Sequence, residues 1–120
     1  EVLQYRWHLF FSVYFEALLR REQFQKLLKI ARKYKLLEKD KSYQAKASYL
    51  PTIPWYVEVA KYKEGMCSRK EMIEFFQADI DAHADSSKKL SSLRDTTANL
   101  QTVIPEVVQK LDWAEGAVRF

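Results

Sequence analysis

The most apolar stretch of the chain is WHLFFSVYFEALL, residues 7–19. Its apolar members are Trp7, Leu9, Phe10, Phe11, Val13, Tyr14, Phe15, Ala17, Leu18 and Leu19. On a helix, successive residues are about 100° apart, so these side chains point in every direction rather than along one stripe. Such a helix needs apolar surfaces on all sides. The pattern therefore predicts a buried N-terminal helix with at least two other helix faces packed around it.

This first helix is expected to span residues 2–37, because the first 50 residues contain neither glycine nor proline. Between residues 22 and 34 the helix becomes amphipathic, with an apolar face opposite a basic one. The apolar face consists of Phe24, Leu27, Leu28, Ala31 and Tyr34, and the basic face of Lys26, Lys29, Arg32 and Lys33. A short second helix is expected within residues 38–50.

Proline and glycine mark the next boundaries. Pro51 and Pro54 end the preceding segment, because proline lacks an amide hydrogen and restricts the residue before it. Pro54 also suits the first turn of a new helix. Residues 55–64 carry apolar side chains at helical spacing, and Gly65 follows them. We therefore expect the new helix to end at Gly65.

Two further helices are expected in the second half. Ser68 and Glu71 have the spacing of a capping box, which predicts that an amphipathic helix begins there and continues at least to Leu93. The apolar stripe then rotates, so a bend or break is expected within residues 91–99. Pro105 is expected to begin or kink a last helix.

The composition determines the fold class. Two glycines and three prolines in 120 residues cannot supply the tight turns of an all-β domain. We therefore expect an all-α protein, a compact bundle of four to five helices around the buried N-terminal helix, with one domain over residues 1–120. The first residue is Glu1 rather than methionine, so we expect a fragment of a longer protein.

Charge is distributed unevenly although the net charge is only +4. Residues 20–46 contain ten Lys or Arg and three acids, whereas residues 64–85 contain six acids and two bases. A nucleic acid could bind the basic outer face of the first helix through Lys26, Lys29, Arg32 and Lys33. The other interpretation is a solvated face that attracts an acidic helix weakly. Neither a recognition-helix motif nor a base-stacking platform accompanies the basic residues.

The sequence offers little catalytic chemistry. It contains no glycine-rich phosphate loop and no GxSxG, CxxC or HExxH motif, so we expect no catalytic residue, cofactor or metal. His8 and His83 lie in apolar helical stretches, which favours core histidines over metal ligands. Cys67 precedes a helix start and is followed by Arg69 and Lys70, an arrangement that can lower a thiol pKa. A reactive cysteine is therefore a third hypothesis.

Aromatic residues are abundant, with 3 Trp, 7 Tyr and 7 Phe. Trp55 and Tyr56 follow a proline boundary and Trp113 lies off its helix's main apolar stripe, so all three are predicted partner-binding anchors, with packing on the bundle as the alternative. The sequence thus predicts a non-catalytic protein–protein interaction or scaffolding domain, whose partner is another protein or another domain of the same chain. Its lone cysteine indicates an intracellular location, cytoplasmic or nuclear. Residues 7–19 are too few to span a membrane.

Overall fold

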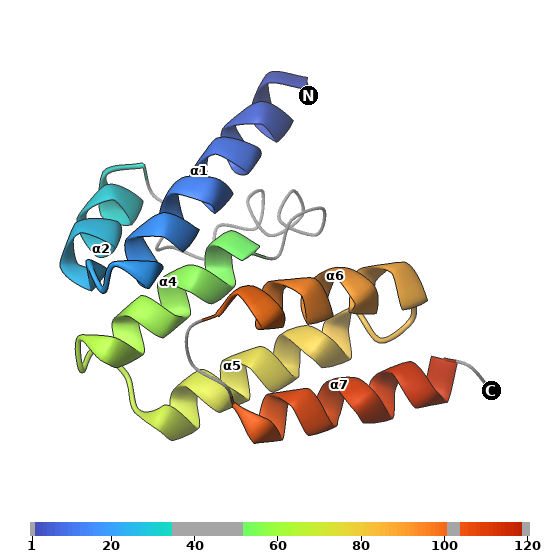
Figure 1. Ribbon diagram of the computed structural model, residues 1–120. Helices are drawn as coiled ribbons and strands as arrows, with labels where there is room; N and C mark the ends of the chain where they lie inside the picture. Colours follow the sequence, from blue (N-terminus) through green and yellow to red (C-terminus); the bar gives the residue numbers. More distant parts are fainter. Residues whose placement is uncertain (1, 35–51, 101–103, 119–120) are drawn as a thin grey trace.

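The computed structural model describes residues 2–34, 52–100 and 104–118. These residues form six α-helices and no strand (Figure 1). The helices are α1 (Val2–Arg20), α2 (Phe24–Lys33), α4 (Thr52–Lys63), α5 (Arg69–Ala82), α6 (Ser87–Asn99) and α7 (Pro105–Val118). The predicted all-α class is confirmed, but there are more helices than the predicted four to five. The radius of gyration of 13.9 Å is that of a compact chain of this length. The helix predicted within residues 38–50 lies outside the described residues.

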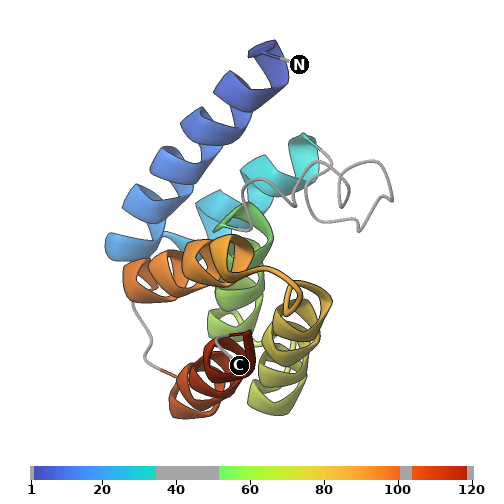
Figure 2. The same ribbon diagram turned by 90° about the vertical axis from the view of Figure 1, so that its right-hand side faces the viewer.

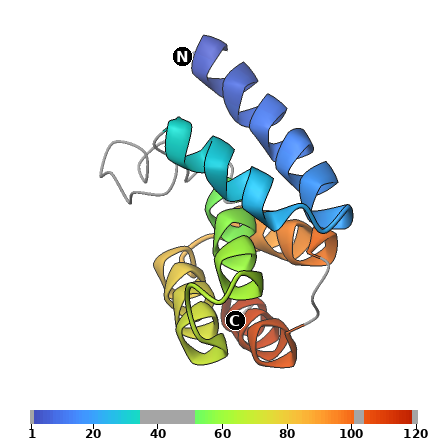
Figure 3. The ribbon, with the colours of Figure 1, turned by 90° about the vertical axis from the view of Figure 1, so that its left-hand side faces the viewer.

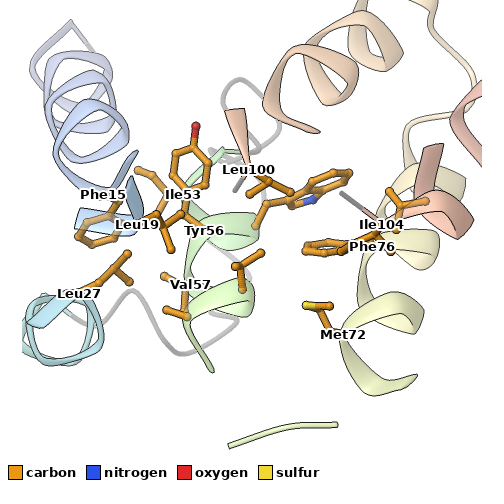
Figure 4. Close-up of a cluster of buried hydrophobic side chains, with 14 of the residues drawn as sticks. Phe15, Leu19, Leu27, Ile53, Tyr56, Val57, Met72, Phe76, Leu100 and Ile104 are labelled. Atoms are coloured by element: carbon orange, nitrogen blue, oxygen red, sulfur yellow. The ribbon is translucent and has the colours of Figure 1, made fainter. Parts of the chain in front are cut away.

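Helix α4 lies at the centre of the molecule. It packs against α1 and α2 as well as against α5 and α6. Its buried side chains cover more than half of the helix circumference, and they are Ile53, Trp55, Tyr56, Val57, Val59 and Ala60. Figure 4 shows Tyr56 and Val57 between Phe15 and Leu27 on one side and Phe76 on the other. Each large side chain buried in this way stabilises the fold by roughly 1.5–3 kcal/mol.

Among residues 9–19 of α1, whose side chains are described, one face is buried and the other is exposed. Phe11, Phe15, Leu18 and Leu19 lie in the core, whereas Leu9 is 41% exposed and Val13 is 68% exposed. The prediction that other helices surround the whole stretch is therefore wrong for residues 9–19. The main neighbours of α1 are α2 and α4, and its buried residues Phe11, Phe15, Leu18 and Leu19 fall on one side at about 100° per residue. In Figure 2, the N-terminal half of α1 extends away from α5, α6 and α7.

The predicted helix over residues 2–37 is interrupted by a turn after Arg20. The amide of Gln23 donates to the carbonyl of Leu18 at 2.9 Å, and the amide of Glu22 donates to the carbonyl of Leu19 at 3.0 Å. These two bonds define a Schellman motif, which requires a left-handed residue after the helix. Glu22 takes that conformation with φ of 56°. The chain consequently folds back, and α2 packs against α1 and α4 instead of extending α1.

The boundaries predicted from Gly65 and from the capping box are confirmed. Gly65 has φ of 75° and ends α4 with a second Schellman motif, in which the amide of Met66 donates to the carbonyl of Lys61 at 2.8 Å. The amide of Glu71 donates to the Ser68 hydroxyl at 3.1 Å, and the Glu71 carboxylate accepts from the Ser68 amide at 3.2 Å. Both bonds of the capping box therefore form at the start of α5.

The helix that begins after Ser68 ends earlier than predicted. It was expected to reach Leu93, but α5 ends at its C-cap His83, and α6 begins after Ser86, whose hydroxyl accepts from the amide of Lys89 at 3.4 Å. Ser86 is a favourable N-cap, and this local signal outweighed the continuous apolar stripe. The break expected within residues 91–99 thus lies before α6. It allows α6 to pack against both α4 and α7.

Ion pairs join α7 to its two neighbours. Arg69 of α5 lies 2.8 Å from Glu106, and Lys110 lies 2.8 Å from Asp81 of α5. Arg94 of α6 binds Asp112 and Glu115 of α7, and its Nε donates to the Glu115 carboxylate at 2.5 Å. Pro105 is the first residue of α7, as predicted. The C-terminal three helices are therefore held by charge as well as by their apolar faces.

Candidate functional site

The predicted aromatic anchors occupy different places in the structure. Trp55 and Tyr56 are core residues with no exposed surface, whereas Trp113 on α7 is 67% exposed. The indole nitrogen of Trp55 donates to the Asp79 carboxylate at 2.6 Å, and its ring lies 4.5 Å from that of Phe76. Trp55 and Tyr56 thus join α4 to its neighbours and offer no surface to a partner in this conformation. Of the three, Trp113 is accessible.

The Tyr56 hydroxyl is buried, and its environment is unfavourable for a phenolate. Burial raises the pKa of Tyr56 to about 12, and the carboxylate of Glu16 acts in the same direction. The side chain therefore stays neutral at physiological pH. It acts as a large apolar core residue rather than as an acid or base.

Cys67 does not have the properties of an activated thiol. Burial raises its pKa, and the neighbouring carboxylates of Glu58 and Glu71 raise it further. The thiol donates to Glu58 Oε1 at 3.8 Å. Lys61 acts in the opposite direction but does not reverse the shift. The arrangement is therefore opposite to the one that the reactive-cysteine hypothesis needs.

His83 has the environment of the core histidine that the sequence predicted. Its side chain is largely buried, and its Nδ1 donates to the backbone carbonyl of Asp79 at 2.7 Å. The same nitrogen lies 3.5 Å from the Asp79 carboxylate, which also accepts from Trp55. Asp79 thus connects α4 to the end of α5. The corresponding expectation for the His8 side chain lies outside the described side chains.

Exposed apolar side chains cluster on the outer face of α1, which the sequence analysis assigned to the core. Leu9, Phe10 and Val13 are 41%, 55% and 68% exposed. Together with the half-buried Tyr14 they line a shallow hollow of about 550 Å³. Leu9 and Val13 form one row of residues four apart, and Phe10 and Tyr14 form the next row. The described lining of the hollow therefore comes from two adjacent ridges of one helix, with a groove between them.

Aromatic contacts connect this groove to α2. The rings of Phe10 and Phe11 are 5.5 Å apart, and the ring of Phe11 is 5.1 Å from that of Tyr34, which follows α2. The ammonium of Lys33 lies 5.6 Å from the centre of the Tyr34 ring. Figure 3 shows α1 and α2 next to each other on one side of the molecule. The apolar groove and the basic helix therefore belong to one continuous surface.

The basic face predicted on residues 22–34 is exposed. Lys26, Lys29, Arg32 and Lys33 all lie on the solvent side of α2. None of the four forms an ion pair with an acid within the part of the chain that the structure describes. Their charge is therefore not neutralised by those residues and remains able to attract an anionic partner.

The sequence did contain a signal for the groove. Residues 7–19 were recognised as apolar on every side, and this observation has two explanations. One is a helix surrounded by its own chain, and the other is a helix that keeps one apolar face for a partner. For the side chains of residues 9–19, the structure agrees with the second explanation. The chain turns at Glu22, and the sequence does not predict this turn because the position lacks the usual glycine.

The described residues contain no group of three or more His, Cys, Asp and Glu side chains that could hold a metal ion. No helix among them combines the length and apolar character that crossing a membrane requires. Comparison of the chain with protein-family models, with curated proteins and with solved structures found no match.

Proposed function

We propose that this chain is a non-catalytic interaction domain that binds another protein through the outer face of α1. The observation that carries the proposal is the exposure of Leu9, Phe10 and Val13 on one side of one helix, where they line an apolar hollow. Exposed apolar side chains that cluster in this way are typical of interaction surfaces, whereas scattered ones are normal. Aromatic residues at the centre of such a surface supply much of the binding energy.

Trp113 is a second candidate contact. It is the exposed member of the three aromatic residues predicted to bind a partner, and it lies on α7. No other exposed large apolar side chain accompanies it on the described part of α7. We therefore place the main contact on α1 and treat Trp113 as a separate, smaller contact.

The experiment compares Val13→Asp with a matched control. Val13 is exposed, so the substitution leaves the core intact while placing a charge in the groove. Ala78→Asp introduces the same side chain at an exposed position of α5. Proteins captured by the wild-type domain are quantified by mass spectrometry. We expect a set of partners that is retained by Ala78→Asp, unaffected or slightly reduced by Trp113→Ala, and lost by Val13→Asp. A set retained by Val13→Asp refutes the proposal.

Nucleic-acid binding through α2 is the alternative function. It is supported by Lys26, Lys29, Arg32 and Lys33, which are exposed and not ion-paired among the described residues, and by the half-exposed Tyr34 beside them. An aromatic ring next to cations can stack on a base. Neutralising phosphates releases counterions, so binding would weaken steeply as salt rises. A filter-binding titration that detects no binding at low salt, or binding insensitive to salt, excludes this alternative.

A further inference from the structure

The groove on α1 has the shape that receives a helix. Its walls are the row of Leu9 and Val13 and the row of Phe10 and Tyr14, and residues four apart on a helix form the ridges that pack into grooves of a second helix. Ala17 is also exposed and continues the first row. A helix that places one ridge between these rows would cover the exposed apolar side chains.

The charges on the two sides of the groove differ. On the side away from α2, Glu16 and Arg20 neutralise each other at 2.6 Å. On the side of α2, Lys33 approaches the aromatic cluster that borders the groove, and Lys26 shares its exposed face. A helix is about 10–12 Å wide with its side chains, so a helix in the groove would bring its flank close to α2. The surface thus combines an apolar centre with one basic edge.

Charge complementarity identifies the kind of occupant. Building on the proposed function, we infer that the α1 groove binds an amphipathic helix of another protein that carries Asp and Glu on the flank facing α2. A second copy of this chain fits less well, because α1 against α1 would also bring together two basic α2 faces and two molecules of net charge +4. The apolar ridge supplies affinity, and the acidic flank supplies orientation and a faster association rate.

The test uses a displayed library of helical peptides. Each 18-residue peptide carries leucine along one ridge, and the positions on either flank are randomised among Glu, Gln and Lys. The library is selected at low salt on the 120-residue chain and on three variants. Val13→Asp changes the groove, and Lys33→Glu changes the basic edge. Lys88→Glu is the matched control, because it reverses one exposed charge on α6.

The wild-type chain is expected to enrich Glu over Lys on one flank at least fivefold, with no preference on the other. The same preference is expected with Lys88→Glu. It should fall at least threefold with Lys33→Glu and in 1 M salt, because exposed charges are screened within about 3 Å at that concentration. Val13→Asp is expected to weaken binding of the selected peptides at least tenfold. Peptides selected without a one-sided acidic preference, or bound equally by Lys33→Glu, overturn the inference.

Two further measurements cover the other occupants. Light scattering that finds a dimer of the wild-type chain and a monomer of Val13→Asp would assign the groove to a second copy and overturn the inference. Cosedimentation with phosphatidylserine vesicles, but not with phosphatidylcholine vesicles, that is lost in Val13→Asp would assign the groove to an anionic lipid surface. This result would also overturn the inference. The proposed function is judged separately by protein capture. If partners are lost by Val13→Asp but selected peptides show no charge preference, the function stands and the acidic helix does not.

Discussion

Glu22 occupies a backbone conformation that glycine adopts more easily. Its φ of 56° lies in the left-handed region, which costs a residue with a Cβ atom roughly 1–2 kcal/mol. Replacing it with glycine removes this cost but gives the unfolded chain more freedom, which opposes folding by about 0.4–1 kcal/mol. We therefore expect Glu22→Gly to stabilise the domain by about 0.5–1 kcal/mol. With unfolding entropies of about 2.1 cal/mol/K per residue, this corresponds to a Tm increase of about 2–4 °C.

Differential scanning calorimetry of three variants isolates the backbone effect. Glu22→Ala removes the carboxylate and keeps the Cβ atom, so its Tm should not rise. Gly65 takes the same place after α4 with φ of 75°, and a Cβ added there would contact nothing within 4 Å. Gly65→Ala should therefore lower the Tm through backbone strain alone, by about 4 °C or more for 1 kcal/mol. A Tm for Glu22→Gly at or below that of Glu22→Ala would refute the reasoning.

The remaining predictions concern the core and its ion pairs. Trp55→Phe removes the donor to Asp79 and should destabilise the domain in urea by about 1.5–3 kcal/mol, while the exposed Trp113→Phe should change stability by less than about 0.5 kcal/mol. Arg94→Ala should cost about 1 kcal/mol, and less in 1 M NaCl, because its pairs are partly exposed. In an absorbance titration, Tyr56 should ionise near its pKa of about 12, and stability should fall as pH rises from about 10. Ionisation together with the other tyrosines in the folded protein would contradict that assignment.

Local chemistry was readable from the sequence wherever one residue decides the backbone. Gly65 ends α4, the Ser68 and Glu71 pair opens α5, and Pro105 begins α7. In each case a short-range hydrogen bond or a preferred φ angle sets the helix boundary, and distant parts of the chain are not needed for it. The all-α class followed from the same reasoning, applied to the scarcity of glycine and proline.

Two turns were not predicted because neither contains the glycine or proline that usually marks the end of a helix. Glu22 takes the position that glycine favours, and the break before Ser86 falls inside a continuous apolar stripe. At Glu22 the packing of the following helix compensates for a weak local signal, whereas at Ser86 a favourable N-cap interrupts the stripe. α2 packs on α4 after the first turn, and α6 packs on α4 and α7 after the second.

The identity of the central helix also depends on packing. α4 carries apolar residues over most of its circumference, and residues 7–19 of α1 do so too, so periodicity alone does not show which helix is surrounded. α4 is surrounded because it packs against helices from both halves of the chain. Trp55 and Tyr56 were predicted as anchors because they follow a proline boundary, with packing on the bundle as the alternative. Once α4 is central, these side chains are core, and exposed apolar surface remains on α1.

The turn at Glu22 is also what creates the proposed binding surface. In an uninterrupted helix with a rise of 1.5 Å per residue, Phe11 and Tyr34 would be separated by roughly 35 Å. Their rings are instead 5.1 Å apart. A straight helix would place the basic residues further along the same helix axis instead of beside the apolar groove. The fold-back therefore converts an apolar segment and a basic segment, consecutive in sequence, into one surface with an apolar centre and a charged edge.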